Sequence, residues 1–154
     1  MKQQAIKIET IYFISAIALV ILWGYAVVAK IYEHEKFIAQ IKLSPILLIQ
    51  QIGQALSWIL PITESTLIIL LFSDRHRKLG LLLSFLLLVS FEIYISAMIF
   101  SGLQLPCSCG GIISKLSWKQ HLIFNAVFIF IAIAPMIYDR WDKKDSQEYS
   151  PRSI

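Results

Sequence analysis

The chain has 154 residues, of which 57% are hydrophobic and only 16% are charged, with a formal net charge of +4 at pH 7. Its mean hydropathy is +0.69. A soluble domain of this length could not bury so much apolar surface, so the composition argues against a soluble globular protein. The basic residues lie in short segments between apolar runs, which is typical of membrane topology signals and argues against nucleic-acid binding.

Long uncharged runs divide the sequence into apolar segments. No charged residue lies within 10–29, 43–63 or 93–114, and the run between Lys119 and Asp139 is interrupted only by His121. Runs of this length match the roughly 20 residues that cross about 30 Å of hydrocarbon. The first run is too long for the apolar part of a signal peptide and no small-residue cleavage site follows it, so we expect a retained helix.

The spacing predicts an all-α, polytopic membrane protein built as a bundle of four transmembrane helices in contact with the lipid bilayer. The predicted helices cover residues 9–29, 45–72, 79–101 and 118–138. The second is too long for a perpendicular span, so we expect it to begin at the membrane interface and to bend near Pro61. The tail, 139–154, has alternating charges and is expected to be disordered.

The distribution of lysine and arginine predicts the orientation. With both termini in the cytoplasm, the inner segments hold nine of these residues and the outer segments hold five. The inner nine are Lys2, Lys7, Arg75, Arg77, Lys78, Arg140, Lys143, Lys144 and Arg152. Because cytoplasmic loops carry the excess of positive charge, we expect the segment between the last two helices to face outward.

Both cysteines of the chain lie in that segment, as Cys107 and Cys109 on either side of Ser108. A disulfide that closes so short a ring constrains almost nothing, so a purely structural bridge is disfavoured. The ring would also be strained, and strained, exposed disulfides are the labile or catalytic ones. Two other readings stay open: a pair of free thiols, or a Cu(I) or Zn(II) site that includes His121.

Several stretches of the sequence resemble the MauE branch of the DoxX-like membrane proteins. The stretches are 24–30 with its closing Lys30, Phe37, 44–45, 60–64, the cysteine motif 106–111, 116–118 and 121–125. The resemblance implies a bacterial cytoplasmic membrane protein that works with a thioredoxin-like periplasmic partner. Together they would form or deliver disulfides for a disulfide-rich dehydrogenase subunit in methylamine utilisation. The resemblance does not imply that this chain itself acts in methylamine metabolism.

Two carboxylates lie within the apolar segments, at Glu64 and Glu92. An unpaired carboxylate is costly there, so each is a functional-site hypothesis. Helix rise places Glu92 in the outer half of its segment, where Lys30 could pair with it. Glu92 would then either order the bundle as half of an ion pair or transfer a proton during thiol–disulfide exchange.

His121 and Asn125 are four residues apart and share one face of the last predicted helix. A histidine beside the cysteines would stabilise the attacking thiolate. A histidine satisfied by hydrogen bonds at the membrane interface is an equal alternative.

The sequence therefore favours a membrane thiol–disulfide oxidoreductase with Cys107 and Cys109 as its redox pair, assisted by His121 and Glu92. Its expected partner is a thioredoxin-fold or disulfide-rich protein outside the membrane. A membrane quinone is a possible electron carrier, with Lys30, Glu92 and Tyr94 as candidate polar contacts, although no quinone motif is recognisable. The alternatives are a non-enzymatic assembly scaffold for a secreted redox protein and a Cu(I)-handling membrane protein.

Overall fold

The computed structural model describes residues 2–44, 46–100 and 118–148, and within them every element of regular structure is a helix. The helices are α1 (Lys2–Tyr32), α2 (His34–Lys42), α3 (Leu47–Gln51), α4 (Gly53–Phe72), α5 (Arg77–Phe100) and α6 (Trp118–Glu148). The prediction of an all-α fold is confirmed.

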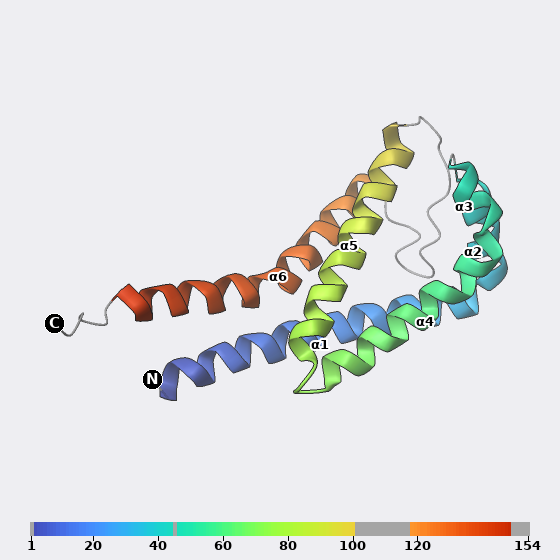
Figure 1. The fold of residues 1–154 in the computed structure, drawn as a ribbon. Helices are drawn as coiled ribbons and strands as arrows, with labels where there is room; N and C mark the ends of the chain where they lie inside the picture. Colours follow the sequence, from blue (N-terminus) through green and yellow to red (C-terminus); the bar gives the residue numbers. More distant parts are fainter. Residues whose placement is uncertain (1, 45, 101–117, 149–154) are drawn as a thin grey trace.

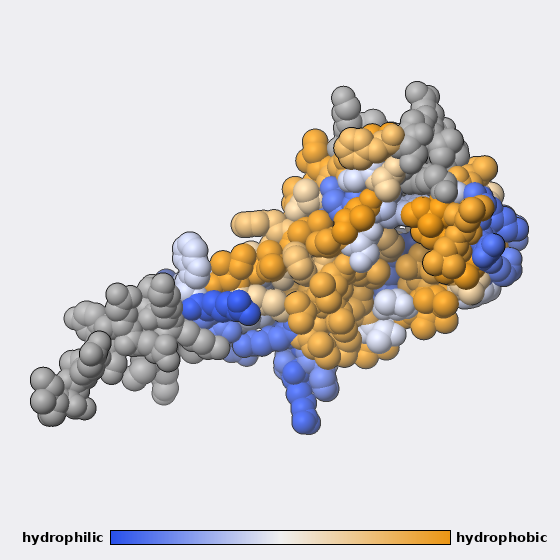
Figure 2. Space-filling view, turned by 45° about the horizontal axis from the view of Figure 1, so that its top comes forward, coloured by the Kyte–Doolittle hydropathy of each residue, from blue (hydrophilic) through white to orange (hydrophobic). Residues whose placement is uncertain are grey.

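Four helices, α1, α4, α5 and α6, are long and apolar enough to cross a membrane. Their outward faces carry large apolar side chains, such as Ile21, Val28, Ile69 and Phe130, each at least two-thirds exposed. Figure 2 shows such side chains over the middle of the bundle, with hydrophilic residues gathered toward its ends. Because lipid is the solvent that suits such a surface, the chain is a multi-pass membrane protein, as the charge spacing predicts.

The four spanning helices form two closely packed pairs. α1 runs along α4 and α5 runs along α6, while α2 and α3 lie together at the end of the bundle away from both termini (Figure 1). The core between the pairs is apolar, with Leu19, Leu71, Leu81 and Leu88 almost inaccessible. The indole Nε1 of Trp23 on α1 donates a hydrogen bond of 3.0 Å to Oγ of Ser84 on α5, which satisfies both groups inside the bundle.

The second predicted helix is divided in two. α3 ends at Gln51 and α4 begins at Gly53, and α4 then continues through Pro61 to Phe72. The break coincides with a close approach of α2: a Cβ atom on Gly53 would lie 3.0 Å from Cγ2 of Ile41. The discontinuity at Gly53 thus lies where α2 packs, and α4 is continuous through Pro61.

The first and last helices, α1 and α6, extend further than predicted toward the two ends of the chain. α1 begins at Lys2, before the expected start at residue 9. α6 continues past Tyr138 to Glu148, so residues 139–148 are helical, and the expectation that the tail is disordered from Asp139 is wrong for them. An established helix extends more easily than a new one nucleates, and no proline follows until Pro151.

A polar contact joins α1, α5 and α6 at the end of the bundle nearest the termini. The carboxylate of Asp139 accepts hydrogen bonds from Nζ of Lys78, at 3.2 Å, and from the hydroxyl of Tyr12, at 3.5 Å. Nζ of Lys78 also lies 5.0 Å from the centre of the Tyr12 ring. Charged groups of this kind fit a membrane–water boundary.

α4 and α5 form a hairpin whose helices approach closely near the turn. Ser73 and His76 close the turn with a backbone hydrogen bond of 3.0 Å. A Cβ on Gly80 would lie 3.1 Å from the backbone nitrogen of Leu71, so only glycine permits this approach without displacement of the backbone. Beyond Gly80 the two helices diverge (Figure 1).

Replacement of Gly80 tests this packing. Gly80→Ala should lower the free energy of unfolding by about 1–3 kcal/mol, because the added methyl group meets backbone that cannot move aside. Gly24 has open space around its Cβ position, so Gly24→Ala should be neutral or stabilising by up to about 1 kcal/mol. Thermal unfolding of both purified variants in one detergent measures the difference. Equal stabilities would contradict the close contact of α4 with α5.

Candidate functional site

A buried ion pair joins α1 to α4. Nζ of Lys30, in the last turn of α1, donates a hydrogen bond of 2.5 Å to Oε1 of Glu64 on α4, and the two side chains are 8% and 0% exposed. Moving two such charges out of water is costly, and the cost is recovered only when the partners meet in good geometry. The pair therefore fixes the position of α1 on α4.

The predicted partner of Lys30, Glu92, is the wrong one. Helix rise gives the depth of a residue along its helix and does not determine which helix α1 faces. α1 lies along α4 and meets α5 over a smaller area, so Lys30 reaches the carboxylate of Glu64.

Glu92 instead faces α6. Its carboxyl group neighbours the side-chain amide of Asn125, although Nδ2 of that amide makes no hydrogen bond of good geometry within the described structure. His121, one turn earlier on α6, is buried and lies within range of the charge on Lys30. Every spanning helix thus contributes to one group of polar side chains, the polar cluster, which consists of Lys30, Glu64, Glu92, His121 and Asn125.

Aromatic rings surround the cation of the polar cluster. Nζ of Lys30 lies 5.7 Å from the ring centre of Phe37 on α2 and the same distance from that of Phe91 on α5. The ring of Trp23 packs against Phe91 at 6.4 Å between centroids. These rings shield the ion pair and add cation–π attraction.

The polar cluster retains unused hydrogen-bonding capacity. Oε2 of Glu64, Oε2 of Glu92 and Nδ2 of Asn125 are buried and have no partner among the described residues. Buried polar atoms are usually satisfied, and each exception calls for an explanation such as a bound molecule. The two acceptors and one donor of the cluster can bind a polar group or exchange protons with it.

The two cysteines predicted as a redox pair lie outside the described residues. Cys107 and Cys109 belong to the segment that leaves α5 after Phe100 and enters α6 at Trp118. The chain connectivity therefore attaches this segment to the ends of α5 and α6 that hold Glu92 and His121. No metal-binding group of three or more His, Cys, Asp or Glu occurs in the part of the chain that the structure describes.

Three of the other predicted site residues belong to the polar cluster, and one does not. His121 lies within range of the charge on Lys30, and Glu92 joins the cluster through Asn125. Tyr94 is two residues from Glu92, so the two side chains leave α5 in different directions. The role of Glu64 as the partner of Lys30, and the aromatic rings of Phe37 and Phe91, were missed.

Removal of one charge of the ion pair should make the bundle easier to unfold. Lys30→Met or Glu64→Leu should each lower the free energy of unfolding by about 3–5 kcal/mol, because the remaining charge is buried alone. The double variant should recover most of this loss. Glu33→Gln breaks the exposed pair of Glu33 with Lys36 and should change stability by less than about 1 kcal/mol. Additive losses in the double variant would contradict a direct Lys30–Glu64 interaction.

Comparison with known proteins identifies the family. Neither the curated proteins nor the solved structures that were searched gave a match. The family model described as methylamine utilisation protein MauE matches residues 8–138, which include two of the membrane spans completely, nearly all of the first and last spans, the polar cluster and both cysteines. The chain belongs to the MauE family, as the sequence motifs suggested.

Proposed function

We propose that the protein is a thiol–disulfide oxidoreductase of the cytoplasmic membrane, with Cys107 and Cys109 as its redox pair. The observation that carries the proposal is the position of the polar cluster. The cysteine segment begins after α5 and ends before α6, and Glu92 and Asn125 lie only about 12 Å and about 10 Å along the helix axes from those ends. Proton-accepting and hydrogen-bonding groups therefore lie on the side of the bundle from which the cysteines extend.

The chemistry is an exchange of disulfides with a second protein. The Cys107 thiolate attacks a disulfide sulfur of the partner, so that a mixed disulfide forms and one partner thiolate leaves. The Cys109 thiolate then attacks the Cys107 sulfur, closes the Cys107–Cys109 bond and releases the second partner thiolate. The partner gains two electrons and the cysteine pair loses two. The reverse sequence, in which the oxidised pair oxidises a partner dithiol, uses the same atoms.

Residues of the polar cluster assist the exchange in this proposal. His121 lies in the first turn of α6, directly after the cysteine segment, where it can stabilise an attacking thiolate. Glu92 can accept a proton released as a thiol ionises, and an ionisable group inside a membrane span is a functional candidate by default. Lys30 and Glu64 hold α1 and α4 in place around these groups.

The proposed partner is a thioredoxin-fold or disulfide-rich protein outside the membrane. A disulfide-rich dehydrogenase subunit would be such a partner within methylamine utilisation, for which the family is named. The arrangement requires the cysteine segment to face outward and both termini to face the cytoplasm. The excess of lysine and arginine in the segments at the terminal end of the bundle supports this orientation.

Single replacement of the cysteines should trap the exchange. Cys109→Ser should accumulate a mixed disulfide between Cys107 and the partner, because the resolving thiol is missing. It should be visible as a band of higher mass on a non-reducing gel of membranes and should vanish on reduction. Cys107→Ser serves as the matched control and should trap less, and the double variant should trap nothing. If the double variant supports cellular function fully, the protein is an assembly scaffold and the oxidoreductase proposal fails.

Labelling of the cysteines should report the orientation. A membrane-impermeant maleimide should modify Cys107 or Cys109 in intact, reduced spheroplasts, because the charge distribution places their segment outside. An added cysteine at Ser73, in the α4–α5 turn of a variant without native cysteines, should react only after the membrane is broken. The opposite pattern would refute the proposed orientation.

A further inference from the structure

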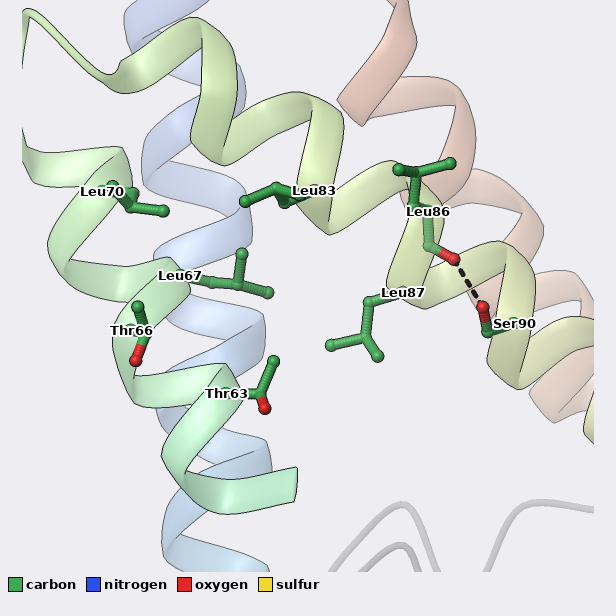
Figure 3. Close-up of a pocket in the computed structure, with 8 residues that line it drawn as sticks. All are labelled: Thr63, Thr66, Leu67, Leu70, Leu83, Leu86, Leu87 and Ser90. Carbon is green, nitrogen blue, oxygen red and sulfur yellow. Dashed lines mark hydrogen bonds between the residues drawn. The ribbon is translucent and has the colours of Figure 1, made fainter. Parts of the chain in front are cut away.

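An apolar groove runs between α4 and α5 where the two helices diverge. It has a volume of about 390 Å³ and is lined by Thr63, Thr66, Leu67, Leu70, Leu83, Leu86, Leu87 and Ser90. Figure 3 shows the leucines of the facing helices on the two sides of this opening. The groove follows from the hairpin, because α4 and α5 touch at Gly80 and separate beyond it.

The hydroxyl groups that line the groove are already occupied. Thr63 donates to the carbonyl oxygen of Ile59 at 2.8 Å, Thr66 to that of Ile62 at 2.9 Å, and Ser90 to that of Leu86 at 2.9 Å. The walls thus offer a ligand no unused hydroxyl proton. A hydrocarbon chain is accordingly the ligand that suits the groove.

The groove leads to the polar cluster along both of its walls. On α4, Leu67 lines the groove and Glu64, one turn away on the same face, binds Lys30. On α5, Leu87 lines the groove and Phe91, again one turn away on the same face, lies beside Lys30. A molecule whose tail lies along Leu67 and Leu87 would therefore bring its head to Glu64, Lys30 and Phe91.

The polar cluster defines the chemistry of that head. It offers donors, at Lys30 and at the unpartnered Nδ2 of Asn125, and an unpartnered acceptor at Oε2 of Glu64, within a setting of aromatic rings. The site also lies within the span, since Glu64 is about 16 Å along α4 from Gly53. A phosphate head group belongs at the membrane surface and does not suit this depth, whereas a flat, uncharged ring with carbonyl groups does.

We propose that the polar cluster and the groove together bind a prenylated quinone, with its ring beside Lys30, Phe91 and Asn125 and its tail between α4 and α5. The donors bind the carbonyl oxygens of the quinone, and the carboxylates of Glu64 and Glu92 accept from the hydroxyls of the quinol. The volume of the groove falls within the range of small-molecule sites.

This site deepens the proposed function and rests on it for its redox role. When the Cys107–Cys109 pair has been reduced by a partner dithiol, its two thiols lose two electrons and two protons as the sulfur–sulfur bond forms again. The quinone ring takes up both electrons and both protons at its carbonyl oxygens and becomes a quinol. The quinone is thus the oxidant that returns the pair to its disulfide form.

Binding of decylubiquinone to the purified, delipidated full-length protein tests the site. Trp23 packs against Phe91, so binding should quench tryptophan fluorescence, and Trp23→Phe should remove much of the signal. Decanol has the same chain without the ring and should not compete at equal concentration. Asn125→Leu should weaken binding by about tenfold, the effect of one buried hydrogen bond.

A pair of variants in α5 tests the tail. Leu87→Phe fills the groove and should also weaken binding by about tenfold, whereas Leu82→Phe, at an exposed position outside the groove, should not. Thermal unfolding of each variant distinguishes lost binding from lost structure. If decanol displaces the probe, the groove binds acyl chains without regard to a ring and the proposal is overturned. Unchanged affinity in both Asn125→Leu and Leu87→Phe overturns it as well.

The cysteine-free protein, with Cys107→Ser and Cys109→Ser, separates this inference from the function on which it rests. It should bind decylubiquinone as tightly as the native chain, because none of the proposed contacts involves a cysteine. Binding without any thiol-dependent reduction of the probe by the native protein would leave the site and refute the quinone as the oxidant of the cysteine pair. Binding together with no trapped mixed disulfide in Cys109→Ser would leave the site and refute the oxidoreductase. Disulfide exchange with no binding would refute the quinone site alone.

Discussion

The Lys30–Glu64 ion pair is the interaction on which the arrangement of the bundle depends. Both side chains are buried in a part of the chain that faces hydrocarbon, where neither charge could remain alone. Their contact sets α1 against α4, and α2 and α5 contribute the rings of Phe37 and Phe91 beside it. A pair of hydrophobic residues would hold two helices together as well. The charges therefore suit the role that we propose for the polar cluster in addition to a structural one.

The two ends of the bundle have different characters. At the end near the termini, Asp139, Lys78 and Tyr12 meet at the boundary of the spans, and Gly80 brings α4 and α5 into contact. Toward the opposite end α4 and α5 separate, and the polar cluster lies within the bundle. The MauE family membership and the cysteine segment between α5 and α6 give this second end its proposed redox function. The hairpin end is the fixed part of the fold, and the open end is the part suited to binding.

The sequence predicted the fold well because charge spacing and bilayer thickness together determine where apolar helices can lie. It also named Lys30, Glu92 and His121, because ionisable groups in apolar segments are conspicuous. It assigned Glu92 to Lys30 wrongly, since helix rise gives depth and not the identity of the neighbouring helix. The break at Gly53 lies where the side chain of Ile41 approaches, a contact between segments that no local pattern records. The groove between α4 and α5 depends in the same way on the contact at Gly80.

The central claim is that Cys107 and Cys109 form a redox pair whose state changes without unfolding the bundle. An equilibrium titration of the purified full-length protein against thiol buffers of graded potential tests it most directly, with alkylation and intact mass reporting the disulfide and circular dichroism reporting the helices. We expect a Cys107–Cys109 disulfide that mild thiol buffers reduce while the helical signal stays constant, because a strained, exposed bond has a high potential. Two thiols that never form the bond, or a bond that opens only as the helices unfold, would contradict it.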